Sequence, residues 1–210
     1  MNYPTDLCQL VIRNMEVIEK APEVAEATEK RLFAAVNARI EKAVKAQKGW
    51  KGCYDVVTDK EEEETTFAPQ GWPENNEEDG VYEAYYTLTY THSTGGEPEY
   101  WLSCATGIMG AALCFAFAVD FKWFDLRLTE YKKMLESFYA DKTALQKHKF
   151  SLAANKESII RAFIFNADAL AAEYPDFDEA LAPLDEALQD LFKVHAEFDK
   201  FVTGLSKKRG

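Results

Sequence analysis

The sequence is short of basic residues and of histidine, and both shortages narrow the range of functions. Lys and Arg number 24 against 36 Asp and Glu, so the formal net charge is −12. A chain this acidic repels a phosphate backbone, and we therefore expect no nucleic-acid partner. The three histidines, His92, His148 and His195, are scattered through the chain. They form no H-E-x-x-H or paired spacing, so the usual helical zinc pattern is absent.

The common catalytic and cofactor motifs are also missing. The sequence contains neither of the glycine-rich phosphate-binding patterns G-x-x-x-x-G-K-[ST] and G-x-G-x-x-G, nor the nucleophile pattern G-x-S-x-G. Its four cysteines are far apart and form no C-x-x-C, which is typical of reduced thiols in a cytosolic protein. The N-terminus has no basic region followed by an apolar run, so we expect no signal peptide. These absences predict a cytoplasmic protein without a bound cofactor.

One long stretch without charge is present, from Tyr100 to Val119. Twenty such residues are enough to cross a bilayer as a helix. Gly107 and Gly110 lie in its middle, however, where a turn would need them, and both flanks are rich in residues that favour strands. We therefore predict a buried β-hairpin with strands near 99–106 and 111–120, and no membrane span.

The other patterns complete an α+β fold. A short strand near 52–58 and the alternating segment 81–92 join the hairpin in a three- or four-stranded antiparallel meander. Two helices precede it, one over residues 5–19 and one opening at Pro22, and about three follow, including one over 152–173. With 47% apolar residues, the 210-residue chain is predicted to form a single domain.

The last predicted helix carries apolar residues at alternating steps of three and four over residues 177–205. This is a heptad seam, which packs either on the protein's own sheet or against a second copy in a homodimer.

An acidic loop over residues 59–80 is the most distinctive predicted surface. Its net charge is −8, two thirds of the excess of the whole chain. Carboxylates would steer a basic partner protein towards the loop, and two aromatic side chains would anchor it. The residues predicted to bind are Glu61, Glu62, Glu63, Glu64, Phe67 and Trp72. This loop gives the leading hypothesis, a non-catalytic protein–protein interaction protein such as an inhibitor, immunity-type protein or adaptor.

A second hypothesis is a metal-dependent hydrolase. In the register of the predicted hairpin, acidic and basic side chains gather at one end of the sheet. These are Glu97, Glu99, Asp120, His92 and Lys122, with the first three as metal ligands. Such a cluster would hold Mg²⁺ or Mn²⁺ and activate a water. Pro98-Glu99, twenty residues, then Asp120-Phe121-Lys122 resembles the P-D…(D/E)-x-K arrangement of restriction-type nucleases, with Glu in place of the first Asp.

A third hypothesis is a small-molecule pocket on the aromatic face of the sheet. Its predicted lining is Tyr82, Tyr86, Tyr90 and Trp101.

Overall fold

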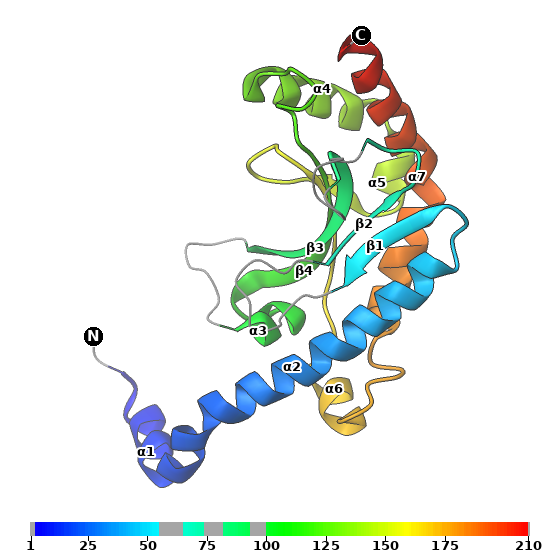
Figure 1. Ribbon diagram of the computed structural model, residues 1–210. Coiled ribbons are helices and arrows are strands. Elements are labelled where there is room, and N and C mark those ends of the chain that lie inside the picture. Colours follow the sequence, from blue (N-terminus) through cyan, green and yellow to red (C-terminus); the bar gives the residue numbers. More distant parts are fainter. Residues whose placement is uncertain (1–2, 55–64, 74–81, 93–99, 210) are drawn as a thin grey trace.

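The computed structural model describes residues 3–54, 65–73, 82–92 and 100–209, and the protein is α+β (Figure 1). In this part of the chain, six strands form one antiparallel sheet in the order β1-β2-β3-β4-β6-β5. The strands are β1 (Trp50–Tyr54), β2 (Thr65–Pro69), β3 (Ala84–His92), β4 (Ala111–Val119), β5 (Phe150–Leu152) and β6 (Ile159–Phe163). The helices are α1 (Thr5–Arg13), α2 (Met15–Lys45), α3 (Trp101–Ala105), the 3₁₀ turn η1 (Ile108–Gly110), α4 (Leu128–Ala140), α5 (Thr143–Lys147), α6 (Ala167–Glu173) and α7 (Ala182–Arg209).

The sheet is larger than the sequence predicted. β2 lies inside the predicted acidic loop, where it pairs with β1 and β3. The predicted helix over 152–173 is wrong for most of its length, because β5, β6 and only the short α6 occupy this region. The apolar residues around Ile159 and Phe163 fit both periodicities, and pairing of β6 with β4 selects the strand.

The predicted hairpin strand over 99–106 is also wrong, since residues 101–105 form the helix α3. The chain does turn at Gly107 and Gly110, which have φ values of +75° and +72° that glycine adopts without strain. The backbone N–H of Leu102 donates to Oε2 of Glu29 on α2 at 3.0 Å, which satisfies a free donor of the first turn of α3. None of the helices within the described ranges is both long and apolar enough to cross a membrane.

β3 takes the place next to β4 that the hairpin model gave to 99–106. The two strands pair over nine residues, from Ala84 with Val119 to His92 with Ala111. Strict alternation gives β4 one bulky face, with Leu113, Phe115 and Phe117 fully buried in the main core. The other face carries small residues and contributes to a minor cluster with Ile160 of β6. The predicted strands near 81–92 and 111–120 are therefore confirmed as β3 and β4.

α7 covers the bulky face of the sheet, and its heptad seam is used within the chain. The residues on the seam that lie in the core are Phe177, Leu181, Leu184, Leu188, Leu191, Phe198, Val202 and Leu205. Phe198 lies at 4.7 Å from Phe117 between ring centroids. Pro183 lies in the first turn of the helix, where a backbone N–H would have no acceptor within the helix. Since the seam packs on its own sheet, it does not offer the surface that the homodimer hypothesis needed.

α2 is one helix of 31 residues, about 46 Å long at 1.5 Å per residue. The boundary with α1 falls at Asn14 rather than at Pro22, so the predicted start of the second helix is wrong. The C-terminal half packs on the sheet through the predicted stripe Leu32, Phe33, Val36, Ile40 and Val44, all fully buried. The N-terminal half and α1 extend away from the body of the protein (Figure 1).

Candidate functional site

The structure separates the residues of the predicted metal cluster. His92 pairs with Ala111 at one end of the β3–β4 pair, whereas Asp120 follows Val119 at the other end. Eight residue steps of a strand at about 3.4 Å each put roughly 27 Å between these two positions. Glu97 and Glu99 lie outside the described residues. The register that brought His92 and Asp120 together required a strand over 99–106 beside β4. In the structure, β3 occupies this position instead.

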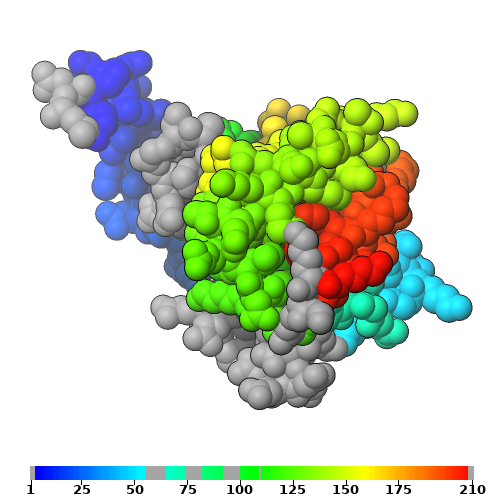
Figure 2. All heavy atoms as spheres, turned by 90° about the horizontal axis from the view of Figure 1, so that it is seen from above, coloured from blue at the N-terminus to red at the C-terminus, as the bar shows by residue number. Residues whose placement is uncertain are grey.

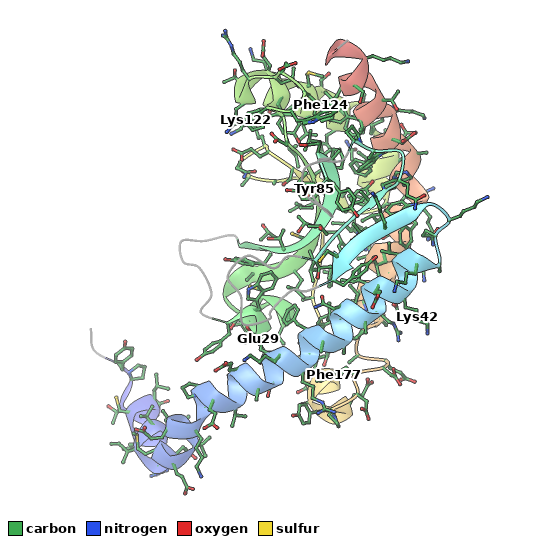
Figure 3. The ribbon with its side chains drawn as sticks, viewed as in Figure 1. Glu29, Lys42, Tyr85, Lys122, Phe124 and Phe177 are labelled. Atoms are coloured by element: carbon green, nitrogen blue, oxygen red, sulfur yellow. The ribbon has the colours of Figure 1, made fainter. Side chains whose placement is uncertain are left out.

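Asp120 and Lys122 belong to the turn that follows β4, where Figure 3 labels Lys122. Oδ1 of Asp120 accepts the backbone N–H of Lys122 at 2.9 Å, and both residues are exposed. This is a local turn-forming bond of the kind aspartate makes two residues along the chain. Over the ranges that the structure describes, no group of three or more His, Cys, Asp or Glu side chains is arranged to hold a metal ion.

The two predicted anchor residues of the acidic loop are core residues. Phe67 of β2 is completely buried and packs on Tyr86 and Phe115. Trp72 is 5% exposed, and its Nε1–H donates to Oδ1 of Asp199 on α7 at 3.1 Å. Neither side chain can act as an exposed anchor. Glu61, Glu62, Glu63 and Glu64 lie outside the described residues.

At Tyr86, packed side chains fill the space where the aromatic pocket was predicted. This residue is completely buried, and its hydroxyl lies 3.2 Å from Nδ1 of His195. Burial raises the pKa of Tyr86 well above its usual value and lowers the pKa of His195, so both are held neutral at pH 7. The rings that surround Tyr86 belong to Trp50, Phe67, Trp72, Phe117 and Phe198. Tyr82 is buried, and Tyr90 lies apart from this cluster, in edge contact with Trp101 at 5.2 Å.

A different site lies between α2, α3 and α6, and we call it the apolar groove. It is an open cleft with a volume of about 620 Å³. The lining residues are Val24, Ala25, Thr28, Leu32, Tyr100, Leu102, Ser103, Thr106, Ile108, Ala167, Leu170, Ala171, Tyr174 and Phe177. α2 supplies one wall, α3 and η1 the second, and α6 with the segment that follows it the third.

Two hydroxyls that line the groove are already bonded to their own helices. Thr28 Oγ1 donates to the carbonyl of Val24 at 2.7 Å, and Thr106 Oγ1 donates to the carbonyl of Leu102 at 2.9 Å. The carboxylate of Glu29 on α2 accepts a hydrogen bond from the first turn of α3 (Figure 3). Burial raises the pKa of Glu29, and bonds from the backbone N–H groups of Leu102 and Trp101 partly offset this effect. The groove is therefore suited to apolar groups more than to a polar ligand.

A second apolar surface continues from the groove along α2. We define the N-terminal arm as residues 3–24, which comprise α1 and the first ten residues of α2. α1 contains no buried residue. Nine large apolar side chains of the arm are 39% to 72% exposed: Tyr3, Leu7, Leu10, Val11, Ile12, Met15, Val17, Ile18 and Val24. The arm projects from the rest of the molecule (Figure 2). Val24 belongs to both surfaces, so the arm and the groove are continuous.

The exposed large apolar residues are confined to this side of the described structure. Besides the nine on the arm, they are Ile108 and Tyr174, which line the groove, and Ile164. Ile164 is adjacent to Phe165, whose N–H donates to the carbonyl of Ala105 in α3 at 2.7 Å. A contiguous apolar surface on a folded chain typically marks a binding site. The spacing of Leu7, Val11, Met15 and Ile18 predicted a helix over residues 5–19, but periodicity alone does not show that this face is exposed.

Comparison with models of known protein families, with curated proteins and with solved structures finds no match to this chain.

Proposed function

We propose that the protein is a non-catalytic interaction protein that binds an amphipathic helix of a partner protein with the apolar groove and the arm. The observation that carries this proposal is that, among the residues the structure describes, eleven of the twelve exposed large apolar side chains lie on these two continuous surfaces. A cleft between helices with three apolar walls suits side chains spaced at i, i+3 or i+4, and i+7 on an incoming helix. The arm adds an extended surface that a small molecule would leave uncovered.

The energy available is sufficient for specific binding. On these two surfaces, eleven large apolar side chains are about half exposed, and burying them would contribute roughly 10 to 15 kcal/mol before the costs of association. Those costs are about 4 to 15 kcal/mol, so the net affinity depends on how well the arm and the partner are pre-organised. A partner that also orders the arm would bind more weakly than its contact area suggests.

The charge of the arm favours a protein partner over a membrane surface. Residues 3–24 contain four acidic and two basic residues, within a chain of net charge −12. Helices that bind membrane surfaces typically carry Lys and Arg on the polar face, which attract anionic lipids. The polar face of the arm lacks this attraction, so a protein partner fits the arm better than an anionic membrane surface does.

The proposed class of function is the one the sequence suggested, but the surface is new. The acidic loop loses Phe67 and Trp72 as anchors because both are buried in the core. A cytoplasmic location remains part of the proposal and is supported by four free cysteines, of which Cys8 and Cys53 are exposed.

A displayed library of helical peptides tests the proposal. Selection on the wild-type protein is expected to return amphipathic helices whose binding is at least tenfold weaker with Ala171→Arg, because the new side chain occupies the groove. Ala196→Arg is the matched control, since both alanines are exposed and lie on helices, but Ala196 is on α7 outside the groove. Selected helices that bind both variants as tightly as wild type, or a selection without helical binders, would rule out the proposal.

A further inference from the structure

We propose that the helix bound in the apolar groove is the arm of a second copy of this chain, so that two copies form a twofold-symmetric dimer by exchanging arms. This inference rests on the proposed function and specifies the partner. It follows from four features of the described residues: the weak intrinsic stability of the arm, its composition, the continuity of arm and groove along α2, and the size of the combined surface.

The arm is helical although little in its own chain holds it so. α1 has nine residues, no buried residue, and Pro4 at its N-cap without a side-chain cap bond. Isolated helices of this length are marginal in water. Pro22 lies inside α2 and removes one helical hydrogen bond, which weakens the connection between the arm and the packed half of the helix. A segment of this kind is expected to become rigid only when its apolar residues are covered.

The composition of α1 matches the groove. Thr5, Gln9 and Arg13 follow one another at steps of four, so they occupy a single polar stripe with Asp6 at its edge. The remaining residues of α1 are Leu7, Cys8, Leu10, Val11 and Ile12, which make most of the helix circumference apolar. The groove presents mainly apolar side chains, and the hydroxyls of its two threonines are bonded to their own helices. The arm and the groove are therefore both suited to an apolar contact surface. Both are left uncovered within one chain.

The arm and the groove lie along one face of α2, and this placement is compatible with a twofold-symmetric dimer. Val17, Ala21, Val24 and Thr28 follow one another at steps of four and three, so they share one helix face that runs from the arm into the groove. Two such helices crossing antiparallel near Ala21 would each place their arm over the groove of the other. The small side chain at the crossing point allows close approach of the helices.

The same arrangement offers one contact between opposite charges. An antiparallel pair centred near Ala21 brings Lys20 of one copy towards the partner's Glu23, at the rim of the contact. In a twofold exchange, both arms and both grooves are occupied, so the assembly is closed and stops at two copies. An open arrangement, in which each arm reached a different neighbour, would instead build filaments.

The size of the combined surface is adequate for a stable dimer. Specific interfaces involve about 20 to 30 residues on each side. The arm spans residues 3–24 and the groove is lined by fourteen residues, so each chain offers more than that number. An exchange dimer would also place eleven of the twelve exposed large apolar residues of the described structure in the contact between the two copies.

Sedimentation velocity of the full chain tests the inference, with 23.8 kDa expected for one copy and twice that mass for the dimer. The wild type is expected to sediment as a dimer at micromolar concentrations. Leu10→Glu on the arm and Ala171→Arg in the groove are each expected to raise the dimer dissociation constant at least tenfold. Gln9→Glu on the polar stripe and Ala196→Arg on α7 are the matched controls and should change it less than twofold.

Mixing the two interface variants makes the test specific for exchange. The arm of the Ala171→Arg chain is intact and fits the intact groove of the Leu10→Glu chain, so an equimolar mixture should recover a heterodimer, weaker than the wild-type dimer because one of two contacts remains. A wild-type chain that stays monomeric up to about 100 μM overturns the inference, as does a dimer that Leu10→Glu or Ala171→Arg alone leaves intact. A monomeric chain that still selects Ala171-dependent helical peptides would overturn the exchange and leave the proposed function standing.

Discussion

The buried ion pair between Arg161 and Asp190 gives the sharpest prediction about stability. Arg161 lies in β6 on the face that α7 covers, and its side chain is 5% exposed. Its Nε and Nη2 donate to Oδ2 of Asp190 at 3.1 and 2.8 Å, and Nδ1 of His148 lies 2.8 Å from Oδ1 of the same carboxylate. Asp190→Ala would leave the buried guanidinium with only one carboxylate contact, the longer one from Nη2 to Oε1 of Glu186 at 3.4 Å, and we expect it to be strongly destabilising.

The magnitude follows from burial. Removing one partner of a buried ion pair costs about 3 to 5 kcal/mol, whereas replacing both with apolar residues of similar volume is often neutral. We therefore predict that Asp190→Ala lowers the free energy of unfolding by about 3 to 5 kcal/mol, and that the double variant Arg161→Met/Asp190→Leu lowers it by less than about 1 kcal/mol. Lys149→Ala is the control, since its pair with Glu186 is more than half exposed and screened by water, so its loss should change the free energy of unfolding far less.

The pH dependence provides a second measure of the same pair. Burial raises the pKa of Asp190, but the hydrogen bonds from His148 and Arg161 outweigh burial, and the pKa is lowered overall. The contribution of Asp190 to stability is therefore present above the unfolded pKa of about 3.9 and is lost as pH falls through the lowered pKa. Urea denaturation at pH 7 and at pH 3 measures both effects. A single variant as stable as wild type, or a double variant as unstable as the single one, would refute the reasoning.

Three further predictions concern the helix cap and the aromatic core. Glu29→Ala should cost about 1 kcal/mol by removing the cap of α3. Glu29→Gln should abolish the gain in stability expected of the wild type as pH falls through the raised pKa of Glu29 towards the unfolded value of about 4.3, and urea titrations over this range check both. Trp72→Phe should lose about 1 kcal/mol with its bond to Asp199, and Trp72→Ala about 3 to 5 kcal/mol, whereas an exposed anchor would lose almost nothing in the same denaturation assay. Because burial lowers the pKa of His195, stability should fall as pH drops below about 6.5, and His195→Gln should show a smaller decline between pH 7 and 5.

The parts of the fold that the sequence predicted are those with a strong local period. The alternation in β3, the two faces of β4 and the heptad seam of α7 are each visible within one segment, and each face needs only one partner surface. The parts that it missed depend on distant residues. α3 is capped by Glu29, which stands about seventy residues earlier in the chain. β6 is selected by its pairing with β4 and by Arg161, which reaches Asp190 on α7.

The candidate site was missed for a related reason. Leu7, Val11, Met15 and Ile18 were visible as an apolar stripe, and such a stripe is normally buried in the same chain. Its exposure depends on the continuity of α2 through Pro22, which carries the arm beyond the sheet. Conversely, Phe67 and Trp72 stood among acidic residues in the sequence, and only the pairing of β2 and the packing of α7 show that they are buried.

Hydrogen exchange of the arm and the groove at different protein concentrations tests directly whether two copies exchange arms. We predict that amides of residues 5–21 exchange almost at unfolded rates in dilute solution. We also predict that they and the amides of α6 become protected together as concentration rises through the dimer dissociation constant. Hydrogen exchange in both segments that is independent of protein concentration would contradict the exchange of arms.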